Sequence, residues 1–370
     1  MDLPIGTVLG DNYEIIRPIG IGGMGSIYEA AHVTTRKRVA IKMMSKELAA
    51  HPEALARFRR EVQVTTELAH PNIIEVVDFG ASPTGEPYLV MEYLDGEDLE
   101  ARLERDGRVP LPVAVQIIKQ VASALSVAHA AGVVHRDLKP GNVFLLRTPD
   151  NSVFVKVVDF GISKVLRAAT TKLTMARAVV GTPEFMSPEQ AAGRVDQIDH
   201  RSDQWALAVG AWHMLSGRLP FWKPDVNGIL NQVIAEEPTP LAPEFAGLIP
   251  REVEKVLRRV FSKKREDRYP TINAFARAFE AAAATAAPAR ATAAAPAARH
   301  AAQQRGRTGL WLALIAVALI GAAAGWIYRV EITSASWWPD DFPRAGGAES
   351  ADDLKVAPGD GAHRRRPPRR

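Results

Sequence analysis

The first 280 residues mix hydrophobic and polar positions with the periods of strands and helices, whereas the remainder of the chain does not. The segments YEIIRPI and SIYEAAHV flank a run of glycines and are rich in Tyr, Ile and Val, which predicts two strands joined by a tight turn. VAIK and PYLVM predict two further strands. RFRREVQVTTELAH carries apolar residues at helical spacing, which predicts an amphipathic helix. This mixture predicts a folded α+β domain over residues 13–280.

Residues 309–328 have no polar face. The run LWLALIAVALIGAAAGWIY carries no charge, and its 19 residues would span roughly 28 Å as a helix, close to the thickness of bilayer hydrocarbon. Trp311, Trp326 and Tyr328 lie near its ends, where amphipathic rings favour the membrane interface. A buried core helix is the alternative, but such a helix normally keeps a polar face. The pattern therefore predicts a transmembrane helix.

The flanks of this helix indicate its orientation. Residues 281–308 are mostly Ala with Pro, Thr, Gln and Arg, which predicts a flexible or partly helical linker. Arg299, Arg305 and Arg307 precede the helix. It is followed by Arg329 and Glu331 and then by Asp340, Asp341, Glu349, Asp352 and Asp353, while the terminal arginines, which oppose this bias, lie far from the membrane edge. Because basic flanks stay inside, the first domain is expected in the cytoplasm. The start, MDLPIGTVLGDNY, shows no signal-peptide pattern, and residues 329–370 are expected to be a disordered tail on the outer side.

Composition excludes several chemistries. The chain has no cysteine, so disulfides, thiolate metal sites and cysteine nucleophiles are ruled out. The net charge is +4, but the last eight residues, HRRRPPRR, contain five arginines. The basic character therefore belongs to the tail, and we expect no nucleic-acid partner.

The glycine run Gly20-Ile21-Gly22-Gly23-Met24-Gly25 fits the pattern G-x-G-x-x-G. A dinucleotide-binding fold would place this pattern between a strand and a helix, whereas here strands are expected on both sides. This favours a hairpin whose turn covers phosphate groups, with an ordinary glycine turn as the alternative. Lys42 could pair with those phosphates or simply end its strand. Glu61 could pair with Lys42 or be a solvated helix charge.

The segment His135-Arg136-Asp137-Leu138-Lys139-Pro140-Gly141-Asn142 places a carboxylate, an ammonium and an amide within six residues of a predicted loop. These groups suit phosphoryl transfer: Asp137 would orient a hydroxyl and accept its proton, Lys139 would neutralise the phosphoryl group, and Asn142 would hold a metal ion. Asp98 opens a predicted helix and could cap it or bind a ribose hydroxyl.

The string VVDFG occurs twice, at 76–80 and 157–161. Asp159 follows Asn142 by 17 residues, and both side chains carry the hard oxygen ligands that Mg²⁺ prefers. Asp78 precedes the segment ASPTGEP, so we interpret it as a turn residue between two strands. Chain order therefore assigns the metal to Asp159.

Taken together, these motifs resemble the bacterial, eukaryotic-like (Hanks-type) serine/threonine protein kinases over about residues 13–280. The resemblance implies a bilobal kinase fold with a small β-rich N-lobe and a larger helical C-lobe, followed by the linker and one transmembrane helix. It implies transfer of the γ-phosphoryl group of ATP to Ser or Thr of protein substrates, with Mg²⁺ or alternatively Mn²⁺. It assigns catalytic roles to Lys42, Glu61, Asp137 and Lys139, and metal binding to Asn142 and Asp159. The ATP-binding residues would be Ile19, Gly20, Ile21, Gly22, Gly23, Met24, Gly25, Ser26, Ile27, Lys42, Glu92, Leu94 and Asp98, with Met91 as gatekeeper.

The resemblance also implies regulation. Thr174, and second Thr171, would be phosphorylated in an activation segment, and Arg136 would pair with the phosphate. Thr182 would contact the catalytic aspartate, Glu189 would pair with Arg268, and Asp203 would brace the catalytic loop. A homodimer for trans-autophosphorylation is expected from the family, and the membrane helix then predicts a single-pass protein of the bacterial cytoplasmic membrane.

Two other functions are weighed against this one. A pseudokinase would lack Lys42, Asp137 or Asp159, and none of these is missing. A cell-envelope tether would depend on the membrane segment and the basic tail more than on the kinase.

Overall fold

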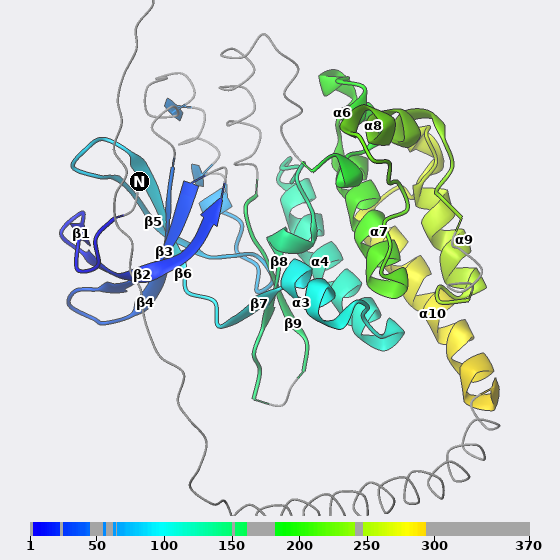
Figure 1. Ribbon diagram of the computed structural model, residues 1–370, viewed down its shortest axis with the longest axis horizontal. Coiled ribbons are helices and arrows are strands. Elements are labelled where there is room, and N and C mark those ends of the chain that lie inside the picture. Colours follow the sequence, from blue (N-terminus) through cyan, green and yellow to red (C-terminus); the bar gives the residue numbers. More distant parts are fainter. Residues whose placement is uncertain are drawn as a thin grey trace, which may run out of the picture. The chain divides into compact units, whose positions relative to one another are not determined.

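Strands predominate first and helices afterwards along the described part of the chain, which belongs to the unit Met1–Ala295. The computed structural model describes residues 3–22, 25–44, 55–56, 62–63, 65–149, 152–160, 182–240 and 247–293. A strand-rich N-lobe and a helical C-lobe follow one another along the chain (Figure 1). The predicted α+β, bilobal arrangement is confirmed.

The N-lobe is a six-stranded antiparallel sheet in the order β1-β2-β3-β4-β6-β5. Its strands are β1 (Val8–Leu9), β2 (Tyr13–Gly22), β3 (Gly25–His32), β4 (Arg38–Met43), β5 (Val76–Ala81) and β6 (Pro87–Glu92). Successive side chains of β4 alternate between two apolar clusters: Ile41 joins one, and Ala40 joins the other together with Leu89 and Met91. Lys42 is two residues after Ala40 and therefore points to the face that carries the cleft.

The hairpin of β2 and β3 contains the glycine run. Gly22 pairs with Gly25 across the turn, as the flanking strand patterns predict. Gly25 has φ of +131°, and a Cβ built there would lie 2.0 Å from the backbone oxygen of Met43. Only glycine fits at this position, because both the backbone angle and the close approach of β4 exclude a side chain.

The C-lobe combines helices with a small sheet. The helices are α3 (Leu99–Asp106), α4 (Leu111–Ala130), α6 (Pro188–Ala191), α7 (His200–Ser216), α8 (Val226–Ala235), α9 (Arg251–Val260) and α10 (Ile272–Ala293). The sheet is β7 (Gly96–Asp98), β8 (Val143–Leu146) and β9 (Phe154–Val157). Short 3₁₀ turns are η1 (Pro140–Asn142), η2 (Pro183–Phe185), η3 (Val195–Gln197) and η5 (Arg265–Asp267). The catalytic segment lies between α4 and β8.

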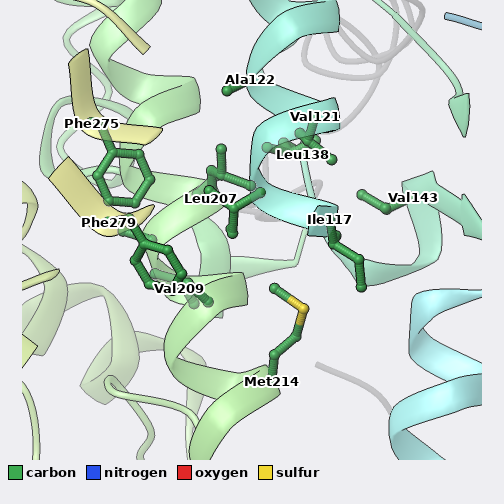
Figure 2. Packing of buried hydrophobic residues seen from close by; sticks show 14 of the residues in the cluster. Ile117, Val121, Ala122, Leu138, Val143, Leu207, Val209, Met214, Phe275 and Phe279 are labelled. Atoms are coloured by element: carbon green, nitrogen blue, oxygen red, sulfur yellow. The ribbon is translucent and has the colours of Figure 1, made fainter. Parts of the chain in front are cut away.

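The core of the C-lobe is centred on α4 and α7. Figure 2 shows Ile117 and Val121 of α4, Leu207 of α7, and Phe275 and Phe279 of α10 gathered in one apolar cluster. In the part of the chain that the structure describes, α4 alone is long and apolar enough to cross a membrane. It packs against α7, α10 and β9, so it is a core helix.

Helix α10 runs past the predicted domain boundary at residue 280. Ala282 and Ala283 are buried in the C-lobe core, so the first residues of the predicted linker belong to the folded unit. The rest of the linker, the predicted membrane helix at 309–328 and the tail at 329–370 lie outside the described residues.

Candidate active site

The catalytic loop is held in place by Asp203 of α7. The carboxylate of Asp203 is fully buried and accepts hydrogen bonds from the backbone amides of His135 (2.9 Å) and Arg136 (2.8 Å). His129 Nε2 donates a third, at 2.8 Å. Arg136 has φ of +67°, an unfavourable angle for a side chain this large, which these bonds hold in place. Asp203 therefore holds the backbone of the loop at His135 and Arg136.

The charge of Asp203 is stabilised by the same contacts. Burial alone would raise the pKa of its carboxyl group, but the hydrogen bond and charge of His129, with the amide of Arg136, lower the pKa below its ordinary value. The carboxylate stays ionised at neutral pH and keeps both amides oriented.

The loop brings the predicted catalytic groups together. Lys139 Nζ lies 4.0 Å from Asp137 Oδ2 and donates a hydrogen bond to Thr182 Oγ1 at 3.3 Å. Asn142 Nδ2 donates to the backbone oxygen of Asp137 at 2.7 Å. Because the amide nitrogen of Asn142 faces Asp137, its amide oxygen is the atom left for a cation. The predicted contact between Thr182 and Asp137 stays a prediction; the structure links Thr182 to the loop through Lys139.

Lys42 and Asp159 meet across the cleft. Lys42 is buried in β4, and its Nζ lies 2.7 Å from both carboxylate oxygens of Asp159. Asp159 has φ of +62°, an unusual angle for a residue other than glycine. Such strained backbone angles are concentrated at functional sites. Glu61, the predicted partner of Lys42, lies outside the described residues.

The metal assignment can be tested against the donor set. Within the described ranges there is no group of three or more His, Asp or Glu side chains that could hold an ion. A carboxylate from Asp159 and an amide oxygen from Asn142 are nonetheless hard oxygen donors. They fit Mg²⁺, which commonly takes one or two protein oxygens and completes its shell with water and phosphate.

The other VVDFG copy, at residues 76–80, has different surroundings. Asp78 lies inside β5, beside a register shift between Val76 and Asp78, so its interpretation as a turn residue was wrong. Its Oδ2 accepts the hydroxyl of Tyr13 at 3.1 Å, and its Oδ1 accepts the amide of Phe79 at 2.7 Å. Burial, with this bond to Asp78, raises the pKa of Tyr13 to about 12. The turn lies later in the chain, where the amide of Ser82 donates to the backbone oxygen of Glu86, and β5 continues through Asp78 to Ala81.

A cavity of about 450 Å³ lies beside these groups. Seven predicted nucleotide or metal residues line it: Ile19, Gly20, Ile27, Glu92, Leu94, Asp98 and Asp159, as does the predicted gatekeeper Met91. The sequence interpretation missed Arg17, Ala40, Ile74, Tyr93, Gly96, Glu97, Ala101, Gly141, Phe144 and Val158. Ala40, Gly141 and Val158 lie inside motifs whose neighbouring residues were assigned the roles, and the others lie outside those motifs.

Three predicted nucleotide-binding residues, Asp98, Gly25 and Ser26, have defined places in the secondary structure. Asp98 Oδ1 caps α3 by accepting the amide of Ala101 at 2.8 Å, so the capping role is observed and the ribose role stays a prediction. Gly25 and Ser26 begin β3 and do not line the cavity. Of the remaining positions in the glycine run, Gly23 and Met24 lie outside the described residues, as do the side chain of Ile21 and the surroundings of Gly22.

A buried ion pair anchors the segment that follows Thr182. Glu189 of α6 accepts hydrogen bonds from Arg268 Nη1 (3.0 Å) and Nη2 (2.9 Å), and both side chains are almost fully buried. Burial opposes the charge of Glu189, but Arg268 and Ser202 lower its pKa below the ordinary value. Gln190 Nε2 then donates to the backbone oxygen of Arg136 at 2.7 Å, which joins α6 to the catalytic loop.

Two histidines were missed as parts of the site. His129 donates to Asp203 from α4, 74 residues away in sequence, and no motif announces it. His135 is the first residue of the catalytic segment, and its ring makes contacts that the sequence interpretation did not assign. Its Nε2 donates to the backbone oxygen of Val158 at 3.0 Å, and its ring contacts that of Phe160 at a centroid distance of 4.8 Å. The ring therefore links the catalytic loop to the strand end that carries Asp159.

The fold and the site together define a protein kinase of the serine/threonine type. Residues 13–279 match the protein kinase domain, and the chain belongs to that family. It is 41% identical over 285 residues to the serine/threonine-protein kinase Pkn1 of Myxococcus xanthus, which covers 76% of this chain and 40% of Pkn1. It is 38% identical over 284 residues to PknA of Mycobacterium tuberculosis, covering 76% of this chain and 63% of PknA.

A solved structure agrees with this assignment. The kinase domain of PknI from Mycobacterium tuberculosis is similar with a TM-score of 0.59 and 29% identity, over 76% of this chain and 100% of that one. These relatives support the bacterial serine/threonine branch, and the predicted enzyme class is the class of this family. The match spans less than two thirds of the curated relatives' own length.

Proposed function

We propose that this chain is an ATP-dependent protein kinase that phosphorylates Ser or Thr side chains of proteins. One observation carries the proposal: Asp203 holds a loop that presents Asp137, Lys139 and Asn142 together, and Lys42 meets Asp159 across the cleft. A pseudokinase has no need to keep all of these groups in one place.

Each residue has a separate task in the proposed reaction. Asp137 orients the substrate hydroxyl and takes its proton, while Lys139 stabilises charge on the transferred group. Lys42, now paired with Asp159, can turn to the α and β phosphates when ATP enters. Bound Mg²⁺, held by Asp159 and Asn142, would neutralise the phosphate oxygens. Positioning and charge provide most of the acceleration, because the transition state for phosphoryl transfer is loose.

Activation by phosphorylation is the second part of the proposal. Thr174 and Thr171 lie outside the described residues, so the support comes from Arg136. Its guanidinium makes no hydrogen bond or ion pair within the described part of the chain, whereas its backbone is fixed by Asp203 and Gln190. A phosphate of about −1.5 to −2 charge is a suitable partner for such a guanidinium.

Location and assembly complete the proposal. The uncharged run at 309–328 supports a single-pass protein of the bacterial cytoplasmic membrane, with the kinase in the cytoplasm and the tail outside. Autophosphorylation in trans would then occur within a homodimer at the membrane.

The test is direct. The purified full chain is incubated with Mg-ATP, and phosphorylated residues are mapped by mass spectrometry beside the variant Asp137→Asn. We expect phosphate on Thr174, and less on Thr171, in the parent alone. No phosphate on the parent, or equal phosphate on both proteins, would overturn the kinase proposal.

A further inference from the structure

A buried carboxylate in the N-lobe holds two arginines. Glu29 of β3 is 4% exposed. Arg17 Nη2, from the neighbouring strand β2, lies 2.7 Å from Glu29 Oε2, and Arg38 Nε, from β4 on the other side, lies 2.7 Å from Oε1. A buried carboxylate is stable only when it is paired in this way. Glu29 therefore fixes two guanidinium groups, one from each strand that neighbours β3.

Both arginines reach the segment that joins the lobes. The guanidinium carbon of Arg38 lies 3.8 Å from the centre of the Tyr93 ring, well within the range of a cation–π interaction. Arg17 Nη2 lies 3.5 Å from the hydroxyl of Tyr93. Tyr93 directly follows β6, and Arg17 and Tyr93 both line the nucleotide cavity.

The other side of this connector is tied to the C-lobe. Glu92 Oε1, one residue earlier, lies 2.6 Å from Lys156 Nζ of β9 and also accepts the backbone amide of Glu75. Residues at such a connector absorb backbone rotation when lobes move, so their position sets the width of the cleft. Glu92 is held by the C-lobe sheet, and Tyr93 by the N-lobe sheet.

We infer that Glu29, Arg17 and Arg38 form a clamp on Tyr93 that positions the connector for nucleotide binding. These are positioning residues, because Glu29 and Arg38 act through Tyr93. The inference deepens the proposed kinase function and rests on it. Arg38 suits the task because its planar guanidinium can pair with a carboxylate at its edge and stack on a ring with its face.

The experiment uses the purified full chain and measures the Kd for Mg-ATP, together with KM for ATP and kcat. Arg38→Ala and Glu29→Gln are expected to raise Kd and KM about three- to tenfold and to change kcat less than about twofold. Tyr93→Leu removes the ring on which Arg38 stacks, so it should match Arg38→Ala. Combining Arg38→Ala with Tyr93→Leu should add little, since both changes remove one contact.

The chain offers a matched control. Arg36, in the connection between β3 and β4, pairs with Glu14 of β2 at 3.0 Å and does not line the cavity. Arg36→Ala should leave Kd and KM unchanged. Should Glu29→Gln fail to fold, Arg38→Ala decides, because it removes a half-exposed side chain rather than a buried one.

The outcomes are distinguishable. A parent that neither binds nor uses ATP overturns the proposed function itself. An active parent whose Arg38→Ala variant melts earlier but binds Mg-ATP normally, or no worse than Arg36→Ala, shows that the cluster only stabilises the sheet. The inference would then be wrong while the kinase function stands.

Discussion

At the scale of single residues, Asp159 and Asp78 have the same four neighbours in sequence and different partners in space. Asp159 faces Lys42, whereas Asp78 bonds Tyr13. We predict that Asp159→Asn lowers the phosphoryl-transfer rate about 10²- to 10³-fold, because an anionic oxygen ligand is lost from the reacting centre. Asp78→Asn should change the rate by less than about twofold, since it lies outside that centre. Initial rates with saturating Mg-ATP measure both.

Equal losses in the two variants would show that chain order had assigned the metal to the wrong copy. The sequence distinguishes the copies because Asp159 follows Asn142, but it does not predict that β5 continues through Asp78 to Ala81. His129 marks another limit. It is an isolated histidine on a helix, and its contact with Asp203 arises only when α4 packs on α7. Local patterns cannot report a contact that packing creates.

At the scale of elements, the Glu189–Arg268 pair fastens α6 to the loop before α10. We predict that Arg268→Leu destabilises the fold by about 3–5 kcal/mol, because it leaves a buried carboxylate without its partner. Lys255→Ala, which removes an exposed pair with Glu252, should cost less than about 1 kcal/mol. Urea unfolding of both variants at pH 7 gives the comparison, and similar losses would contradict the prediction.

The same ion pair implies a limit at acidic pH. The folded-state pKa of Glu189 is lowered, so its contribution to stability is complete above the unfolded pKa of about 4.3 and disappears as the pH falls through the lower folded value. Asp203 behaves in the same direction. The parent should therefore lose stability below about pH 4.3, and Arg268→Leu, which no longer holds Glu189 ionised, should lose less over that window. A parallel decline in both proteins would assign the acid sensitivity to other groups.

Strands and loops were predicted correctly where one local sequence pattern was strong. The strands around the glycine run follow from their Tyr, Ile and Val content, and the loop of Asp137 follows from its prolyl and glycyl breaks. The end of α10 was harder to predict, because an Ala-rich segment is compatible with either a linker or a helix. Burial of Ala282 and Ala283 against the core decides it.

At the scale of the whole molecule, two apolar segments of similar length, α4 and residues 309–328, are assigned to different environments. The first lies in the protein core, and the second is expected in the bilayer. Helix α4 is apolar enough to cross a membrane, yet it packs against α7, α10 and β9. The run at 309–328 follows a domain whose core already closes through Phe275, Phe279 and Ala283. An uncharged run of this length can span the hydrocarbon of a bilayer, so we expect it to enter the membrane.

We therefore predict that the full chain stays with bacterial membranes after alkaline carbonate washing, and that deleting 309–328 releases it. The deleted form should keep its phosphoryl-transfer rate, because the described site residues all precede Ala293. Deleting 341–360, a segment of equal length in the tail, is the control and should leave the chain in the membrane. A tag after Arg370 should be cleaved by protease added to intact spheroplasts, since the basic flank at Arg299, Arg305 and Arg307 keeps the kinase side inside. Release of the parent by carbonate would contradict the membrane helix, and a protected tag would reverse its orientation.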